Sequence, residues 1–68
     1  MRTIDQARTQ AQQNSKNGYA AILHCTDPAI RSDEYLVEFN RSVAEEINSD
    51  PSYGYSIVET YENGVRRT

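Results

Sequence analysis

Hydrophobic positions recur at helical spacing near the start of the chain, over residues 3–16. The apolar residues that share one face of this predicted helix are Ile4, Ala7 and Ala11. Thr3 and Gln6 have the spacing of a capping box, in which each side chain accepts a hydrogen bond from the other residue's backbone N–H. Asn17-Gly18 predicts the end of the helix, because either residue tolerates a left-handed backbone. The narrow, Ala-rich stripe indicates a helix that lies close to whatever it covers.

Two later segments have the short length and the strand-forming residues of β-strands. The first is Tyr19–Cys25, and the second covers residues 55–61. After the second segment, Asn63-Gly64 is a preferred two-residue hairpin turn, since both turn positions need a positive φ. The predicted register pairs Glu62 with Val65, Tyr61 with Arg66 and Thr60 with Arg67.

The middle of the chain supports two interpretations. In one, a single helix over 33–48 places four apolar residues on one face: Leu36, Phe39, Val43 and Ile47. In the other, residues 35–39 alternate as a strand, and Ser42 opens a short helix to about Ser49, with Glu45 completing a second capping box. The β-branched and aromatic content of 35–39 favours the split.

These elements predict a single α+β domain over residues 1–68 in the order α-β-β-α-β-β. We expect an antiparallel sheet of three to four strands with two helices on one face. The alternative order is α-β-α-β-β, with the one long helix over 33–48. Only 12 of the 68 residues are Ile, Leu, Val or Phe, which is too few for a second core.

Three predicted strands contain adjacent large apolar residues, and neighbours on a strand point to opposite faces of a sheet. These pairs are Ile22-Leu23, Leu36-Val37 and Ile57-Val58. With both helices on one face, the other face exposes aliphatic and Tyr side chains, which favours burial by a partner. The pattern therefore predicts a sheet that stays incomplete on one side until it meets another surface.

Charge is distributed unevenly around a net charge of −3. Residues 1–18 have a net charge of +2, whereas residues 32–64 have a net charge of −7. An acidic surface steers association toward a basic partner. Nucleic-acid affinity depends instead on a basic footprint, so the charge pattern favours a protein partner over direct nucleic-acid binding.

The sequence contains no recognisable catalytic constellation. His24 and Cys25 are the only His and Cys, and as neighbours on a strand their side chains diverge, so they do not form a nucleophile–base pair. One His and one Cys are also too few ligands for a zinc site. No Gly-rich phosphate loop is present. We therefore expect a protein that is not an enzyme and that holds neither metal nor cofactor.

The cellular compartment is predicted from cysteine usage and from the apolar runs. A lone cysteine excludes an intrachain disulfide, whereas small secreted domains with a thin core usually carry several. No apolar run exceeds five residues and the first residues lack a signal-peptide pattern. These features predict a cytoplasmic protein without a membrane segment.

In size and organisation the chain resembles small phage-encoded accessory proteins, such as anti-CRISPR proteins and other anti-defence inhibitors. These are short, cysteine-poor, often acidic, and built from a few strands and helices. The resemblance covers overall size and pattern and rests on no diagnostic motif, so no residue role is carried over from it. It implies an inhibitor that occludes a host nucleoprotein or nuclease.

The sequence thus predicts a non-enzymatic, acidic protein-binding module that works as an inhibitor or adaptor. The alternative is a homo-oligomeric structural or accessory protein, in which the exposed sheet face is buried against a second copy in a homodimer. Tyr and Arg are enriched at the energetic centres of interfaces. The predicted contact residues are Tyr35, Tyr55, Tyr61, Glu38, Glu59 and Arg66.

Overall fold

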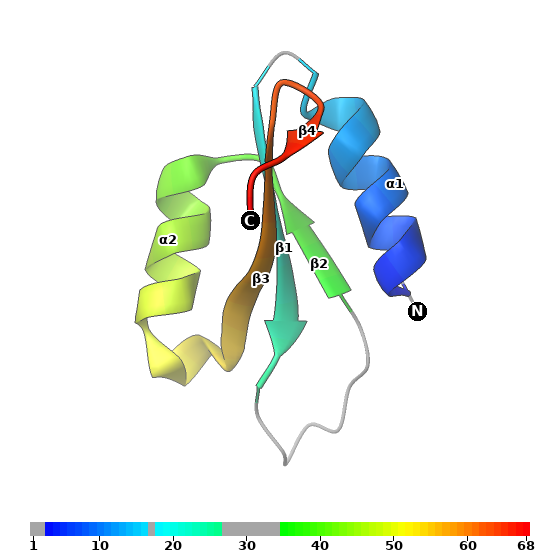
Figure 1. Ribbon diagram of the computed structural model, residues 1–68. Coiled ribbons are helices and arrows are strands. Elements are labelled where there is room, and N and C mark those ends of the chain that lie inside the picture. The colour runs from blue at the N-terminus through cyan, green and yellow to red at the C-terminus, as the bar shows by residue number, and fades with distance from the viewer. Residues whose placement is uncertain (1–2, 17, 27–34) are drawn as a thin grey trace.

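A computed structural model describes residues 3–16, 18–26 and 35–68 (Figure 1). In chain order its elements are α1 (Ile4–Asn14), β1 (Tyr19–Cys25), β2 (Tyr35–Glu38), α2 (Arg41–Ser49), the short 3₁₀ helix η1 (Pro51–Tyr53), β3 (Tyr55–Glu62) and β4 (Val65–Arg66). The strands form one antiparallel sheet in the order β2-β1-β3-β4. The predicted α+β class and the order α-β-β-α-β-β are confirmed. Within the described ranges, no helix has the length and apolar character needed to cross a membrane.

The strand β2 decides between the two interpretations of the middle of the chain. Residues 35–38 pair with β1, where Ile22 lies opposite Val37 and Leu23 lies opposite Leu36. The alternative of one helix over 33–48 is therefore wrong. The reason is that Leu36 and Val37 pack into two different clusters on opposite faces of the sheet, which a strand permits and a single helical stripe does not.

The start of α2 differs from the predicted capping box at Ser42 and Glu45. The N-cap is Asn40, whose side-chain oxygen accepts a hydrogen bond from the Val43 N–H at 3.3 Å. The Glu38 carboxylate accepts hydrogen bonds from the N–H groups of Phe39 and Asn40, both at 3.0 Å. These bonds hold the turn directly after β2, so the helix begins before Ser42.

The first helix keeps its predicted start and ends earlier than predicted. Its capping box is confirmed, with Thr3 and Gln6 bonded reciprocally at 2.9 and 3.2 Å. The C-cap is Ser15, whose N–H donates to the Ala11 carbonyl at 3.0 Å. Asn17 lies outside the described residues. The predicted left-handed stop at Asn17-Gly18 therefore lies partly outside the described residues and stays a prediction.

That turn has the predicted hairpin geometry and also contacts α1. Asn63 and Gly64 have φ values of 54° and 80°, and the register pairs Glu62 with Val65 and Tyr61 with Arg66. Beyond β4, the Arg67 N–H donates to the Thr60 carbonyl at 2.8 Å. The Gly64 N–H donates to the carbonyl of Ser15 at 3.1 Å, and the Asn63 N–H donates to the carbonyl of Gly18 at 2.9 Å. These two donors hold the hairpin against the end of α1.

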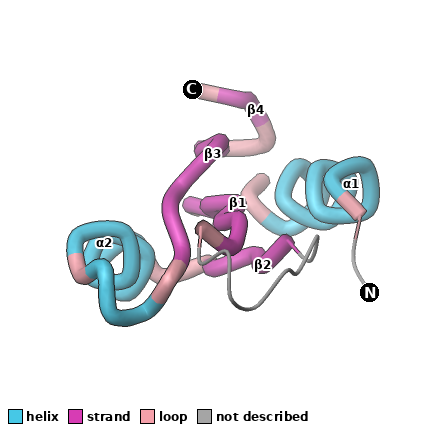
Figure 2. Tube along the Cα trace, turned by 90° about the horizontal axis from the view of Figure 1, so that it is seen from below, coloured by secondary structure: helices cyan, strands magenta, loops and turns pink. Residues whose placement is uncertain are grey.

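The two helices lie on opposite faces of the sheet, not on one face as the sequence analysis expected. Figure 2 shows the strands between α1 and α2. Ala20 and Ile22 share a cluster with α1, whereas Ala21 and Leu23 share a cluster with α2. The strands carry apolar residues on both faces, so each face gains a cover from one helix. Full burial of Ile22 and Leu23 contributes about 1.5–3 kcal/mol each.

A β-bulge lets β3 contribute to both clusters. Ile22 pairs with Glu59 and Leu23 pairs with Ile57, so Val58 is an extra residue without a partner on β1. Ile57 packs on the α2 side, whereas Tyr61 packs on the α1 side. Without the bulge these two residues, four apart, would share a face. One inserted residue therefore changes the face of the sheet on which the later side chains of β3 lie.

The open part of the β3 edge is protected by a side chain. The Asn48 Oδ1 atom accepts a hydrogen bond from the Ile57 N–H at 2.8 Å. β4 is only two residues long and does not extend to this part of β3. A bulge and a side-chain cap are two ways in which proteins prevent edge strands from pairing with other chains. This edge is therefore a poor template for strand addition.

Candidate protein-contact surface

The buried carboxylate of Glu59, on β3, is the centre of a cluster that includes two partly exposed arginines, Arg8 and Arg66. The Arg8 Nε atom donates to its two carboxylate oxygens at 2.9 and 3.1 Å, and Arg8 Nη2 donates to Oε2 at 2.6 Å. The Tyr61 hydroxyl donates to Oε1 at 3.1 Å. From β4, Arg66 Nη2 lies 3.6 Å from Oε2. The Glu59 side chain is only 5% exposed, so its charge is balanced from within the protein.

The pKa values in this cluster follow from these contacts. Hydrogen bonding from Arg8 lowers the pKa of Glu59, the Tyr61 hydroxyl adds to this, and burial opposes both. Burial raises the pKa of Tyr61, and the neighbouring Glu59 carboxylate raises it further. The cluster therefore holds an ionised Glu59 and a neutral Tyr61 at neutral pH.

A second glutamate of β3, Glu62, also contacts two arginines. Arg41, in the first turn of α2, forms an ion pair with Glu62, and Arg67 Nε lies 3.9 Å from the same carboxylate. The Arg41 guanidinium also lies 4.5 Å from the centre of the Tyr19 ring, in a cation–π contact. Hydrogen bonding to Glu62 is the main cause that raises the pKa of Arg41.

All the arginines within the described ranges are thus paired with β3 glutamates, whereas the acidic residues of α2 are not paired. Arg8 and Arg66 contact Glu59, and Arg41 and Arg67 contact Glu62. The exposed Glu45 and Glu46 of α2 form no ion pair with any described residue. The helix α2 therefore exposes two carboxylates that form no ion pair with a described residue, although Arg41 lies close enough to Glu45 for their charges to interact.

Two exposed apolar residues lie where α2 begins. Phe39 precedes the N-cap and is 42% exposed, and Val43 in the first turn is 37% exposed. Val43 and Glu46 are three residues apart and share a face of the helix. We call the set of Phe39, Val43, Glu45 and Glu46 the α2 surface. It combines apolar contact area with negative charge.

The structure divides the predicted contact residues between the two sides of the sheet. Glu59, Tyr61 and Arg66 come together at one cluster, but Glu59 and Tyr61 are buried and offer little surface to a partner. Tyr35 stacks on His24, with ring centres 4.4 Å apart. Tyr55 packs against the α2-side cluster.

Glu38, the remaining predicted contact residue, closes the turn after β2. Sequence analysis missed Arg8 and the α2 surface. Arg8 is 51 residues away from Glu59, and no local signal reports such a pairing. The excess of acidic residues in α2 was visible in the sequence. Whether Glu45 and Glu46 form ion pairs depends on where the fold places the arginines.

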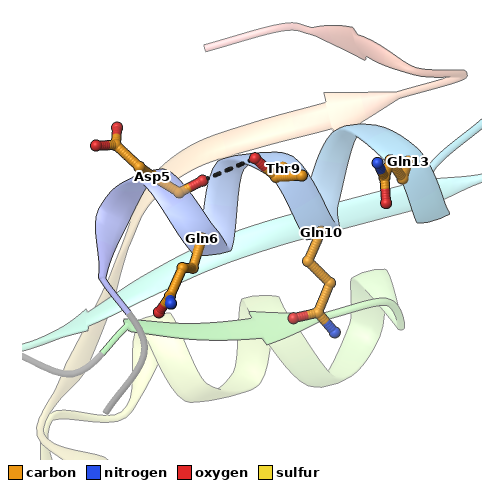
Figure 3. A pocket seen from close by; sticks show the side chains of 5 residues that line it. All are labelled: Asp5, Gln6, Thr9, Gln10 and Gln13. Atoms are coloured by element: carbon orange, nitrogen blue, oxygen red, sulfur yellow. Dashed lines mark hydrogen bonds between the residues drawn. The ribbon is translucent and has the colours of Figure 1, made fainter.

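An open polar groove runs along α1. It is lined by Asp5, Gln6, Thr9, Gln10 and Gln13 and has a volume of about 380 Å³ (Figure 3). The Thr9 hydroxyl donates to the Asp5 carbonyl at 3.0 Å, and Gln6 is used in the capping box. Asp5 is the only titratable residue in this lining set, so the set contains no acid–base pair.

Comparisons with known proteins add no family to this description. No protein-family model, curated protein or solved structure matches the chain. Residues 3–16, 18–26 and 35–68 contain no group of three His, Cys, Asp or Glu side chains placed to hold a metal ion. The function is therefore argued from the charge and the shape of this molecule.

Proposed function

We propose that this protein is a non-enzymatic, cytoplasmic protein-binding module that presents the α2 surface to a basic partner and occludes it. One observation carries the proposal. The described arginines contact Glu59 and Glu62, while the exposed Glu45 and Glu46 form no ion pair with any described residue. A surface of this kind attracts a positively charged partner over long range and raises the association rate.

The apolar residues of the α2 surface supply short-range contact area, whereas its charges act over long range. Phe39 and Val43 are large, exposed and close in sequence to the two glutamates. Interfaces commonly combine an apolar centre with a charged rim, and the rim sets specificity and on-rate. The same contacts disfavour nucleic-acid binding, because each of the four described arginines already contacts a carboxylate that competes with phosphate.

The partner that fits this surface is a protein with a basic face, such as a nucleoprotein or a nuclease. Proteins that bind nucleic acid carry clustered Lys and Arg, and an acidic module can cover such a cluster by competing with phosphate charge. This is the mechanism implied by the resemblance to phage anti-defence inhibitors. The expected incomplete sheet face no longer supports the proposal, since α1 and α2 cover both faces.

Quantitative affinity capture from a bacterial lysate tests the proposal. We expect a stoichiometric partner that the wild-type chain retains at low salt and loses at high salt. The double variant Glu45→Gln/Glu46→Gln should lose it under all conditions. The control Asp5→Asn removes an exposed carboxylate from α1 and should retain it. Equal capture by the wild type and the double variant contradicts a role for the α2 surface.

A second candidate function is a homo-oligomeric accessory protein. It is favoured by two exposed apolar residues of the β3–β4 hairpin, Val58 at 43% and Val65 at 57% exposure. A two-fold interface would bury the same patch on both copies. Light scattering at several concentrations separates the two candidates: a monomer throughout supports the binding module, and a dimer that Val65→Ser dissociates supports self-association.

A further inference from the structure

The helix α1 has little apolar attachment to the rest of the protein. Its buried apolar residues are Ala7 and Ala11, with Ile4 partly buried beside them. Alanine side chains bury little area, and an 11-residue helix is marginal in water without tertiary contacts. On the other face, α2 buries Ala44 and partly buries Ile47, and the sheet gives each helix one fully buried aliphatic residue, Ile22 for α1 and Leu23 for α2.

Polar contacts attach α1 at two points instead. In its second turn, Arg8 donates to the buried carboxylate of Glu59. At its C-terminal end, the Ser15 carbonyl accepts a hydrogen bond from the Gly64 N–H. Both contacts join α1 to β3 or to the turn that follows it.

The Glu59 carboxylate keeps other partners if α1 is removed. Tyr61 on β3 donates to it, and Arg66 on β4 lies 3.6 Å away. These two groups belong to the hairpin and do not depend on α1. The carboxylate therefore stays paired and gains access to water when Arg8 leaves, which lowers the cost of opening compared with an isolated buried charge.

We propose that α1 is a detachable lid: it opens as a unit while the sheet and α2 remain folded, and the Arg8–Glu59 pair is its latch. Opening uncovers the apolar face formed by Ala20, Ile22, Val37 and Tyr61. Segments with few buried apolar contacts are the ones that open below the global unfolding free energy. This lid is independent of the α2 surface, which lies on the other side of the sheet (Figure 1).

Native-state hydrogen exchange of the wild-type chain tests the lid without any mutation. We expect the amides of α1 to be protected at least about tenfold less than those of β1, with a smaller dependence on added denaturant. Equal protection in α1 and β1, with equal denaturant dependence, overturns the proposal, because it means that α1 opens only by global unfolding.

Two arginine variants test the latch. Arg8→Gln keeps helix propensity nearly constant and should raise exchange in α1 by about tenfold, with a much smaller change in β1. Arg66→Gln removes the other arginine near the same carboxylate and should not open α1 selectively. If Arg8→Gln raises exchange equally in α1 and β1, or if Arg66→Gln opens α1 as strongly, the assignment of the latch is wrong.

Discussion

Arg8 and Glu59 are 51 residues apart in the chain, and the guanidinium of Arg8 donates hydrogen bonds to both carboxylate oxygens of the buried Glu59. This contact joins α1 to the sheet on the side where the helix contributes mainly alanine side chains. A charged hydrogen bond in a buried setting contributes more than a neutral one. The pair is therefore a main attachment of α1.

Replacing Glu59 with Gln should lower the free energy of unfolding by about 2 kcal/mol, because two arginines lose a buried carboxylate partner. Glu62→Gln is the matched control. Glu62 also contacts two arginines from the same strand, but its side chain is 34% exposed, so its loss should cost less than about 1 kcal/mol. Urea unfolding of the three proteins measures the difference, and equal losses would show that burial of Glu59 does not strengthen its pairs.

Acidification should remove the contribution of Glu59. Its pKa is lowered in the folded state from an ordinary value near 4.5, so the unfolded chain binds the proton more tightly. The stabilisation is then fully present above about pH 4.5 and decreases as the pH falls through the folded-state pKa. The unfolding free energies of the wild type and Glu59→Gln should converge as the pH falls from neutral to below about 4.5. A gap that stays constant over this interval would mean that Glu59 is not the titrating group.

The turn between β3 and β4 should tolerate a side chain poorly at Gly64. Its φ is +80°, and an added Cβ would lie 3.4 Å from the Cγ atom of Lys16. Gly64→Ala should therefore cost about 1–2 kcal/mol. Gly18→Ala is the control: nothing lies within 4 Å of its added Cβ, so its effect should be near zero. Thermal unfolding of both variants measures this contrast, and a Gly18→Ala loss as large as that of Gly64→Ala would refute it.

The position of the α2 cap is tested by two alanine variants. Asn40→Ala removes the side-chain acceptor of the Val43 N–H and should cost about 1 kcal/mol. Ser42→Ala, at the position that the sequence pattern favoured, should change stability by less than about 0.5 kcal/mol. Denaturant midpoints give the answer, and the reverse order of effects would place the cap at Ser42 after all.

Much of the fold was predictable because its signals are local. The capping box of α1 involves residues three apart, the hairpin turn involves two adjacent residues, and the split of the middle segment depends on a run of five. Each of these features is confirmed. The cap of α2 was misplaced by two residues, since Asn40 and Ser42 are both good capping residues and sequence alone does not rank them in this context.

The candidate site was predictable only as a charge excess. The segregation of acidic and basic residues along the chain is visible in the sequence, but which carboxylates remain unpaired depends on strand register. Glu59 and Tyr61 were expected at a contact surface, and the fold places both inside. Both faces of the sheet are covered by a helix, and the bulge at Val58 places these two side chains on the face that α1 covers.

The sequence by itself determined the elements, their order and the hairpin register, because these follow from backbone preferences and periodicities within a few residues. Only the tertiary structure decided that the helices take opposite faces, that Arg8 meets Glu59, and that Glu45 and Glu46 form no ion pair with a described residue. The physical reason is that side chains distant in sequence meet according to sheet register and to the face on which each residue lies. A single inserted residue moves the side chain of every later residue in the strand to the opposite face.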